Sequence, residues 1–195
     1  MSKVKSTSET GRRSEARERL LRTASRLFYT EGIRAVGVDR VMAEAEIARG
    51  TFYRHFEGKD DLVRACLEGR DQEIRSLLTA AREELTDSSV FLGAVAGGIA
   101  QELCGPGFRG CPFINAAAEY PDRDSVVHQA VLAHRAWFHR VLEEAFRETG
   151  AVDPERAADA MVALRDGAMV AGYLGDPRKA GDTLAHGVAA LVAAR

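Results

Sequence analysis

Residues 38–59 read VDRVMAEAEIARGTFYRHFEGK, and this stretch decides the fold of the N-terminal third of the chain. The apolar residues of its first half recur at helical spacing, which predicts a short helix that ends in a turn at Glu46. A second helix is predicted from Ala48 to Phe56. Two short helices joined by a tight turn are typical of a helix-turn-helix, in which the second helix enters the major groove of DNA.

The second helix of this stretch has two different sides. Phe52 and Phe56 lie one helical turn apart and form an apolar side for packing. A surface helix with ordinary charges is the alternative interpretation, but the turn, the helix lengths and a side rich in donors coincide here as in DNA-binding proteins. The donors suited to phosphates and base edges are Arg49, Thr51, Tyr53, Arg54 and His55.

The segment before this stretch predicts one more helix, over residues 14–31, which Gly32 ends. The three helices predict a small head, residues 14–58, whose core needs the next helix for completion. Residues 1–13 predict a disordered basic arm, which either contacts phosphates or is a tail without a role. The apolar stripe of the first helix is Ala16, Leu20, Ala24, Leu27 and Phe28, and the cations of the arm are Lys3, Lys5, Arg12 and Arg13.

The head contains ASRLF at residues 24–28, GI at residues 32–33 and GTFYRHFEGK at residues 50–59. In these motifs and their spacing the chain resembles the DNA-binding region of the TetR family of bacterial transcription regulators. Gly37 and Ala48 depart from the family pattern, which often has a capping Ser or Thr there, and Glu46 stands where the turn usually has Gly. A missing cap costs about 1 kcal/mol, and a non-Gly residue in a left-handed turn costs about 1 kcal/mol.

The resemblance implies an all-α fold, in which the helix-turn-helix head is joined by a long helix to an all-helical body for ligand binding and dimerisation, residues 59–195. It also implies roles in DNA binding. Tyr53 and Lys59 are expected on phosphates, Thr51 on a phosphate or a base edge, and Arg49 and Arg54 on bases. The full predicted DNA-binding set is Arg40, Arg49, Gly50, Thr51, Tyr53, Arg54, His55 and Lys59.

Helical periodicity continues through the body, and no segment alternates as a strand does. Breakers separate the helices, and both Asp153–Pro154 and Asp176–Pro177 place a capping residue before a Pro suited to a first helical turn. The predicted helices extend from Lys59 to Leu85, from Ser88 or Ser89 to Cys104, from Pro112 to Tyr120, from Asp124 or Ser125 to Thr149, from Pro154 to Leu174, and from Pro177 onward.

The last two helices are rich in small residues, which allow helices to approach closely. The family resemblance implies that these helices form a four-helix dimer interface, and a single recognition helix reads too few bases on its own. The alternative is an interior packing face within one subunit. The predicted interface residues are Ala157, Leu164, Ala168, Ala171, Val188 and Val192.

An effector cavity is expected in the middle of the body, where aromatic side chains and a few polar groups gather between helix breaks. Each of these residues taken alone is better explained by plain core packing. Trp137 either contacts the effector or fills the core, and His134 is expected to be buried and hydrogen-bonded. Nearby Glu102 and Glu119 favour a cationic or hydrogen-bonding apolar ligand. The predicted lining is Phe91, Val95, Cys104, Phe113, Asn115, His134, Trp137, Phe138, Met169 and Tyr173.

Composition bounds the function of the chain. Its 195 residues are 46% hydrophobic and 29% charged, which suits one or two small domains with real cores. Residues 1–60 hold 13 Lys and Arg against 9 Asp and Glu, whereas the rest holds 14 against 20, so only the front is expected to meet DNA. Three Cys without a paired framework, no apolar leader and no long apolar run predict a cytoplasmic protein without a membrane span.

We interpret the chain as a homodimeric, sequence-specific transcription regulator, a repressor that a small-molecule effector releases from double-stranded operator DNA. A ligand-independent DNA-binding or architectural protein is the alternative. An enzyme is disfavoured because the sequence has no nucleophile–base spacing, and no metal motif or cofactor is expected. Activation in place of repression, and redox sensing by Cys104 and Cys111, stay open at this point.

Overall fold

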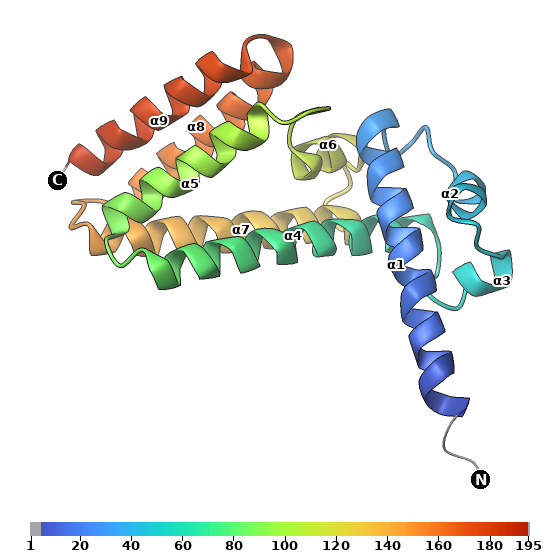
Figure 1. Cartoon of the computed structure of the whole chain (residues 1–195). Coiled ribbons are helices and arrows are strands. Elements are labelled where there is room, and N and C mark those ends of the chain that lie inside the picture. The colour runs from blue at the N-terminus through green and yellow to red at the C-terminus, as the bar shows by residue number, and fades with distance from the viewer. Residues whose placement is uncertain (1–4, 195) are drawn as a thin grey trace. The chain divides into compact units, whose positions relative to one another are not determined.

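The structure is a computed structural model, and it describes the backbone of residues 5–194 and the side chains of residues 15–194. The regular secondary structure of these residues is entirely helical, without strands, so the predicted all-α class is confirmed for the described residues (Figure 1). The elements are α1 (Lys5–Glu31), α2 (Val38–Ala45), α3 (Arg49–Phe52), α4 (Lys59–Glu84), α5 (Ser88–Leu103), α6 (Pro112–Glu119), α7 (Val126–Glu148), α8 (Pro154–Leu174) and α9 (Pro177–Ala193).

The chain divides into two compact units whose boundaries differ from the predicted division at residue 58. The head unit comprises the chain up to Arg70 together with Asn115–Ala130, and the body unit comprises Asp71–Ile114 together with the chain from Val131. The helices α4, α6 and α7 each begin in one unit and end in the other. Sequence periodicity did not reveal these unit boundaries, because a continuous helix has the same apolar pattern on both sides of a boundary.

The head unit is built on the apolar side of α1, against which α2 and α3 pack. Leu20, Leu27 and Phe52 are fully buried, and Leu62 of α4 joins them, so the next helix does complete the small core as predicted. Removing such side chains from water is the main favourable contribution to a core of this size, roughly 1.5–3 kcal/mol for each large one.

Two elements of the head differ from prediction. The helix α1 begins at Lys5, nine residues before the predicted start at residue 14, so it extends into the stretch that was predicted to be a disordered arm. The side chains of the four cations of the arm lie outside the described part of the chain. The α-helix α3 ends at Phe52, and tighter turns, such as His55 N–H to Phe52 O at 2.9 Å, continue the chain to Phe56.

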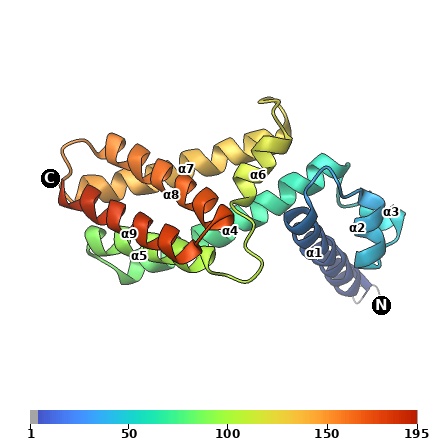
Figure 2. The same ribbon diagram turned by 90° about the horizontal axis from the view of Figure 1, so that it is seen from above.

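The body unit holds α5, α8 and α9 against one another, and both views show the three side by side (Figure 2). The predicted starts of α8 and α9 are confirmed, because Asp153 accepts a hydrogen bond from Arg156 N–H and Asp176 accepts from Arg178 N–H. Gly181 of α9 permits a close approach to α5, since a Cβ at this position would lie 2.8 Å from the Cβ of Ala100. The interface between α5 and α9 therefore depends on the absence of a side chain at this position.

Candidate functional site

The turn between α2 and α3 has the backbone geometry that the sequence led us to expect. Glu46 adopts φ 53° and ψ 45°, and it is the only described non-Gly residue with positive φ. Gly37 and Ala48 occupy the N-cap positions of α2 and α3, and neither supplies a side-chain cap. Sequence reasoning missed Arg19, whose guanidinium donates to the carbonyl oxygen of Ala45 and lies 3.5 Å from that of Glu46. Arg19 thereby satisfies carbonyl groups that the end of α2 leaves open.

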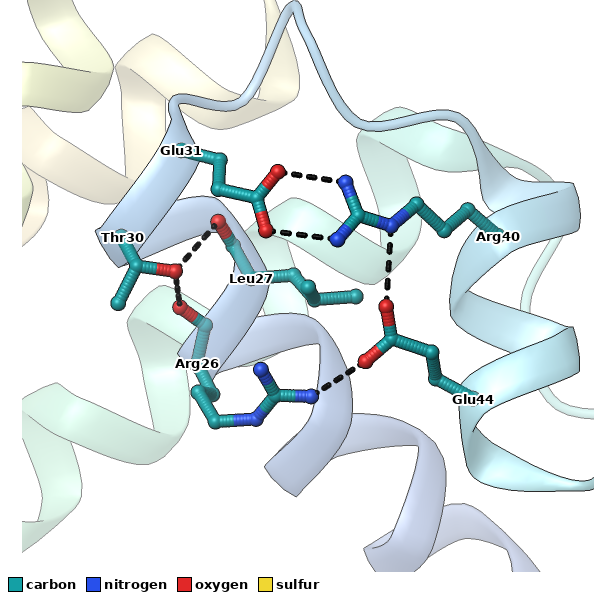
Figure 3. Close-up of polar contacts among 6 residues, drawn as sticks. All are labelled: Arg26, Leu27, Thr30, Glu31, Arg40 and Glu44. Atoms are coloured by element: carbon teal, nitrogen blue, oxygen red, sulfur yellow. Dashed lines mark hydrogen bonds and ion pairs between the residues drawn. The ribbon is translucent and has the colours of Figure 1, made fainter.

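An ion-pair network joins α1 to α2 (Figure 3). The guanidinium of Arg40 donates to both carboxylate oxygens of Glu31, at 2.5 and 2.8 Å, and to Glu44 at 3.0 Å. Arg26 donates to the other oxygen of Glu44 at 2.5 Å. Hydrogen bonds from Arg40 lower the pKa of Glu31, and those to Glu31 and Glu44 raise the pKa of Arg40. Arg40, which was predicted to bind DNA, thus has three of its five N–H donors engaged within the head.

The remaining predicted DNA-binding residues lie in or next to α3, and the exposed ones among them form a donor face. Arg49, Gly50, Tyr53 and Arg54 are exposed, whereas Phe52 on the opposite side is fully buried. The guanidinium of Arg49 lies 5.8 Å from the centre of the Tyr53 ring, and Arg54 donates to the Thr51 hydroxyl at 2.7 Å. These contacts join neighbouring side chains of the donor face to one another.

Two further predicted residues lie at the edges of this face. Lys59 begins α4, and its ammonium group donates to the carbonyl oxygen of Arg34 at 3.4 Å. His55 is half-buried, with its ring beside Phe56. Both therefore contact the head itself, and Lys59 links the start of α4 to the loop between α1 and α2.

The end of α6 binds the same loop, a connection that sequence reasoning missed. The carboxylate of Glu119 accepts hydrogen bonds from the backbone N–H groups of Ile33 at 2.8 Å and Arg34 at 2.6 Å. The Tyr120 hydroxyl donates to Asp60 of α4 at 2.7 Å, and burial together with Asp60 raises the pKa of Tyr120. Glu119 therefore belongs to the head unit. The sequence led us to expect its carboxylate near an effector cavity, where it would bind a cation, but the carboxylate binds the loop between α1 and α2.

A small cavity lies within the body unit. Its volume is about 10 Å³, roughly the room that one water molecule needs. Three predicted pocket residues contribute to it, and the rings of two of them, Phe113 and His134, stack 3.7 Å apart and nearly parallel. The complete lining is Phe113, His134, Arg135, Phe138, Val162, Arg165 and Asp166.

His134 is buried and hydrogen-bonded, as predicted. Its Nδ1 lies 2.7 Å from the Asp71 carboxylate, so Nδ1 carries the proton of the neutral imidazole and donates to Asp71. Burial lowers the pKa of His134 and outweighs the opposite effect of Asp71. Asp71 is also bound by Arg75 at 2.6 Å, and the guanidinium of Arg75 covers the face of Trp137 at 4.2 Å.

Sequence reasoning missed the charged residues of the cavity. Arg165 donates to Asp166 at 2.8 Å and to the Cys111 sulfur at 3.1 Å, and Arg135 lies 2.8 Å from the other oxygen of Asp166. Burial acts to lower the pKa of Arg165, but the Cys111 sulfur and the Asp166 carboxylate raise it more. One signal was available, since Arg165–Asp166 is a charged pair inside the apolar run MVALRDGAMV of α8.

The other predicted pocket residues do not line this cavity. Val95 and Met169 are buried elsewhere in the body core, and Phe91 lies under the guanidinium of Arg82. Cys104 and Tyr173 are exposed. Asn115 belongs to the head unit, and Trp137 lies beside His134 with 5.9 Å between ring centres.

The predicted dimer-interface residues fall into two groups. Ala168 and Val188 are buried within the single chain, where α5 packs against α8 and α9. Leu164 packs on Gly187 of α9, where an added Cβ would lie 2.8 Å from the leucine side chain. Ala171 is exposed, and Ala157 and Val192 are half-buried. Sequence spacing identified the helices but not which of their faces stays outside.

Comparisons with known proteins agree with this architecture. Residues 20–66 match the family model described as bacterial regulatory proteins, tetR family, and residues 105–187 match a tetracyclin repressor-like C-terminal domain. The crystal structure of SCO4454, a TetR-family transcriptional regulator from Streptomyces coelicolor, is 50% identical, with a TM-score of 0.89 over 92% of this chain and 95% of that one. The HTH-type transcriptional regulator LmrA of Bacillus subtilis is 28% identical over 81% of this chain and 84% of its own length.

A TetR-family regulator from Cytophaga hutchinsonii shares the fold, with a TM-score of 0.81 at 18% identity over 93% of this chain and 95% of that one. Among the helices of the described residues, none is both long enough and apolar enough to span a membrane.

Proposed function

Because this chain belongs to the TetR family of DNA-binding transcription regulators, we propose that it acts as a homodimeric repressor that a small-molecule effector releases from its operator. The observation that carries the proposal is the donor face around α3, where exposed Arg49, Tyr53 and Arg54 lie opposite the buried Phe52. A second helix of this kind reads base edges in the major groove, while the residues at its margins bind phosphates.

Dimerisation is supported by the outer sides of α8 and α9. Small and apolar residues that remain exposed in the single chain follow each helix at a spacing of one turn. They are Ala163, Gly167, Val170, Ala171 and Leu174 in α8, and Ala185, Ala189 and Ala193 in α9. Small residues permit close helix packing, and a two-fold dimer doubles the DNA contact on a palindromic site.

Release by an effector is supported by the continuity of α6. Its first turn contains Phe113, which lines the cavity of the body unit, and its last residue, Glu119, binds the backbone of the loop between α1 and α2. A ligand that displaces Phe113 therefore acts on a short helix whose other end is bound to the head. Release follows if the ligand binds the DNA-incompetent conformation better than the DNA-competent one.

Sequencing of the genomic DNA retained by the purified protein tests the proposal. We expect a palindromic site whose half-sites are separated by about one helical turn of DNA or a multiple of it. Arg49→Ala should weaken binding to that site by about 1–3 kcal/mol and relax the preference at one base position. Arg140→Ala, an exposed substitution in α7, is the matched control and should leave binding unchanged. Retention of DNA without any enriched sequence would contradict sequence-specific regulation.

A ligand-independent DNA-binding protein is the second candidate, and the small volume of the cavity, about 10 Å³, favours it. Thermal-shift measurements with a chemically diverse set of small molecules separate the two. A compound that both raises the melting temperature and lowers operator affinity supports effector release. Stabilising compounds that leave operator affinity unchanged support the ligand-independent protein.

A further inference from the structure

The charges around the cavity of the body unit do not balance. Two guanidinium groups, those of Arg135 and Arg165, share the single carboxylate of Asp166, with one oxygen each at 2.8 Å. The nearby carboxylate of Asp71 is already bound by Arg75 and by His134. The cavity wall therefore has one positive charge more than its carboxylates neutralise.

The side chain of Arg165 is more deeply buried than that of Arg135. Its side chain is 12% exposed, against 39% for Arg135, so it loses most of its contact with water. Besides Asp166, it donates to the thiol sulfur of Cys111 at 3.1 Å. A thiol is a weak acceptor, whereas a guanidinium fork matches a carboxylate with two parallel hydrogen bonds. A carboxylate that replaced the Cys111 sulfur would thus be a better partner for Arg165.

The remaining walls suit a flat apolar body attached to such a group. Phe113 stacks on the His134 ring at 3.7 Å, and the Phe138 ring lies nearly parallel to His134 with 6.3 Å between centres. Aromatic ligands gain from parallel or edge contacts with rings of this kind. Because the cavity has a volume of only about 10 Å³, a ligand must open it, and Cys111 directly precedes the first residue of α6.

From this geometry we propose that the effector is an aromatic carboxylate, anchored by Arg165 in place of the Cys111 sulfur and stacked among Phe113, His134 and Phe138. The proposal rests on the proposed function of effector release and names its ligand class. It replaces the cationic ligand expected from the sequence, because Glu119 binds the head and the cavity wall has excess positive charge.

Matched probes of the wild-type protein test the ligand class. We would titrate 2-naphthoate, its neutral amide 2-naphthamide and the cation 2-naphthylmethylammonium, and follow the melting temperature, Trp137 fluorescence and operator affinity. The carboxylate should bind about tenfold or more tightly than the amide, because hydrogen bonds to charged groups are the strong ones. Equal binding of acid and amide, preference for the cation, or no binding of any probe at millimolar concentration would overturn the proposal.

Two variants locate the anchor. Arg165→Met should remove the preference for the acid over the amide, and Arg165→Lys should retain part of it because lysine keeps the charge but not the fork. Arg156→Met, exposed on the same helix, is the control and should keep the full preference. If Arg165→Met does not show a melting transition, the test of the anchor rests on Arg165→Lys. An unchanged affinity for the acid in Arg165→Lys would contradict the assignment of Arg165 as the anchor of the carboxylate.

Failure of this inference differs from failure of the proposed function. Wild-type protein that binds a specific operator but no carboxylate refutes the ligand class only. Protein that binds the carboxylate without any specific DNA site refutes the regulatory function only.

Discussion

Glu46 shows how a single residue in the turn affects the stability of the head. It adopts the left-handed conformation that glycine accepts without a penalty, and its side chain is 86% exposed with a distant ion pair to Arg19. We expect Glu46→Gly to raise the free energy of unfolding by about 0.5–1 kcal/mol, because relief of the left-handed strain outweighs the flexibility of glycine in the unfolded chain. Urea denaturation of the full chain measures the change.

Ala43→Gly is the control for this prediction. Ala43 is exposed in α2, in right-handed helical conformation, where glycine should lower the free energy of unfolding by about 1 kcal/mol. If both glycine variants were destabilised alike, the conformation of Glu46 would not be a source of strain.

His134 makes the stability of the body depend on pH. Burial lowers its pKa below the unfolded value of 6.5, so the folded body holds the neutral imidazole. Above pH 6.5 both states are neutral, whereas below it the unfolded chain binds a proton that the folded chain does not. The free energy of unfolding should therefore decrease as the pH is lowered from 7 to 5. The pKa of Asp71 is also lowered, but its contribution is lost only below about its unfolded value of 3.8.

The variant His134→Phe isolates this contribution. Phenylalanine retains the stacking on Phe113, and Asp71 keeps its ion pair with Arg75. Thermal melting at several pH values between 7 and 5 should show a flatter dependence for the variant than for the wild type. An identical pH dependence in both proteins would assign the effect to other groups.

At the scale of the elements, the contact between α5 and α9 depends on Gly181. A Cβ there would lie 2.8 Å from the Cβ of Ala100, which cannot rotate away, so Gly181→Ala must separate the two helices. We expect a loss of about 1–3 kcal/mol in the free energy of unfolding.

Gly69 of α4 provides the opposite case. It lies in the interior of a helix, and no atom approaches within 4 Å of an added Cβ. Gly69→Ala should therefore stabilise the protein by up to about 1 kcal/mol. Chemical denaturation measures the change in the free energy of unfolding for Gly181→Ala and Gly69→Ala. The two changes should have opposite signs if close packing at Gly181 is the deciding factor, and the same sign if helix propensity alone decides.

At the scale of the whole molecule, the proposed assembly makes a specific prediction. Val170 is 49% exposed on the outer side of α8, so a charge there keeps access to water in the single subunit. In a dimer joined through this side, Val170→Glu places an unpaired charge at an apolar interface, which costs several kcal/mol and should yield folded monomers. Light scattering measures the mass, and helical circular dichroism shows that the subunit is intact.

Ala133→Glu is the control for assembly, since Ala133 is exposed on α7, away from α8 and α9 in sequence. It should remain dimeric. An intact dimer in the Val170 variant would place the interface on another surface. Leu164 is unsuitable for this test, because its contact with Gly187 means that a charge there disturbs the subunit itself.

The sequence alone determined the local features of this protein. Apolar periodicity predicted every helix of the body, Asp–Pro pairs located the starts of α8 and α9, and the motif at residues 50–59 located the helix-turn-helix. These features depend on side chains within a few positions of one another, because a helix is defined by hydrogen bonds between residues four apart. The resemblance to the family's turn also implied the left-handed conformation of Glu46.

Only the tertiary structure decided which partner each polar or small residue has. It placed Arg40 in an ion-pair network, Glu119 on the loop between α1 and α2, Ala168 inside the subunit, and Arg165 at the cavity. The partners of Glu119 lie 85 and 86 positions away in sequence, a separation that no periodicity encodes. Such contacts arise from the packing of whole helices, which selects one exposed face from several that the sequence permits.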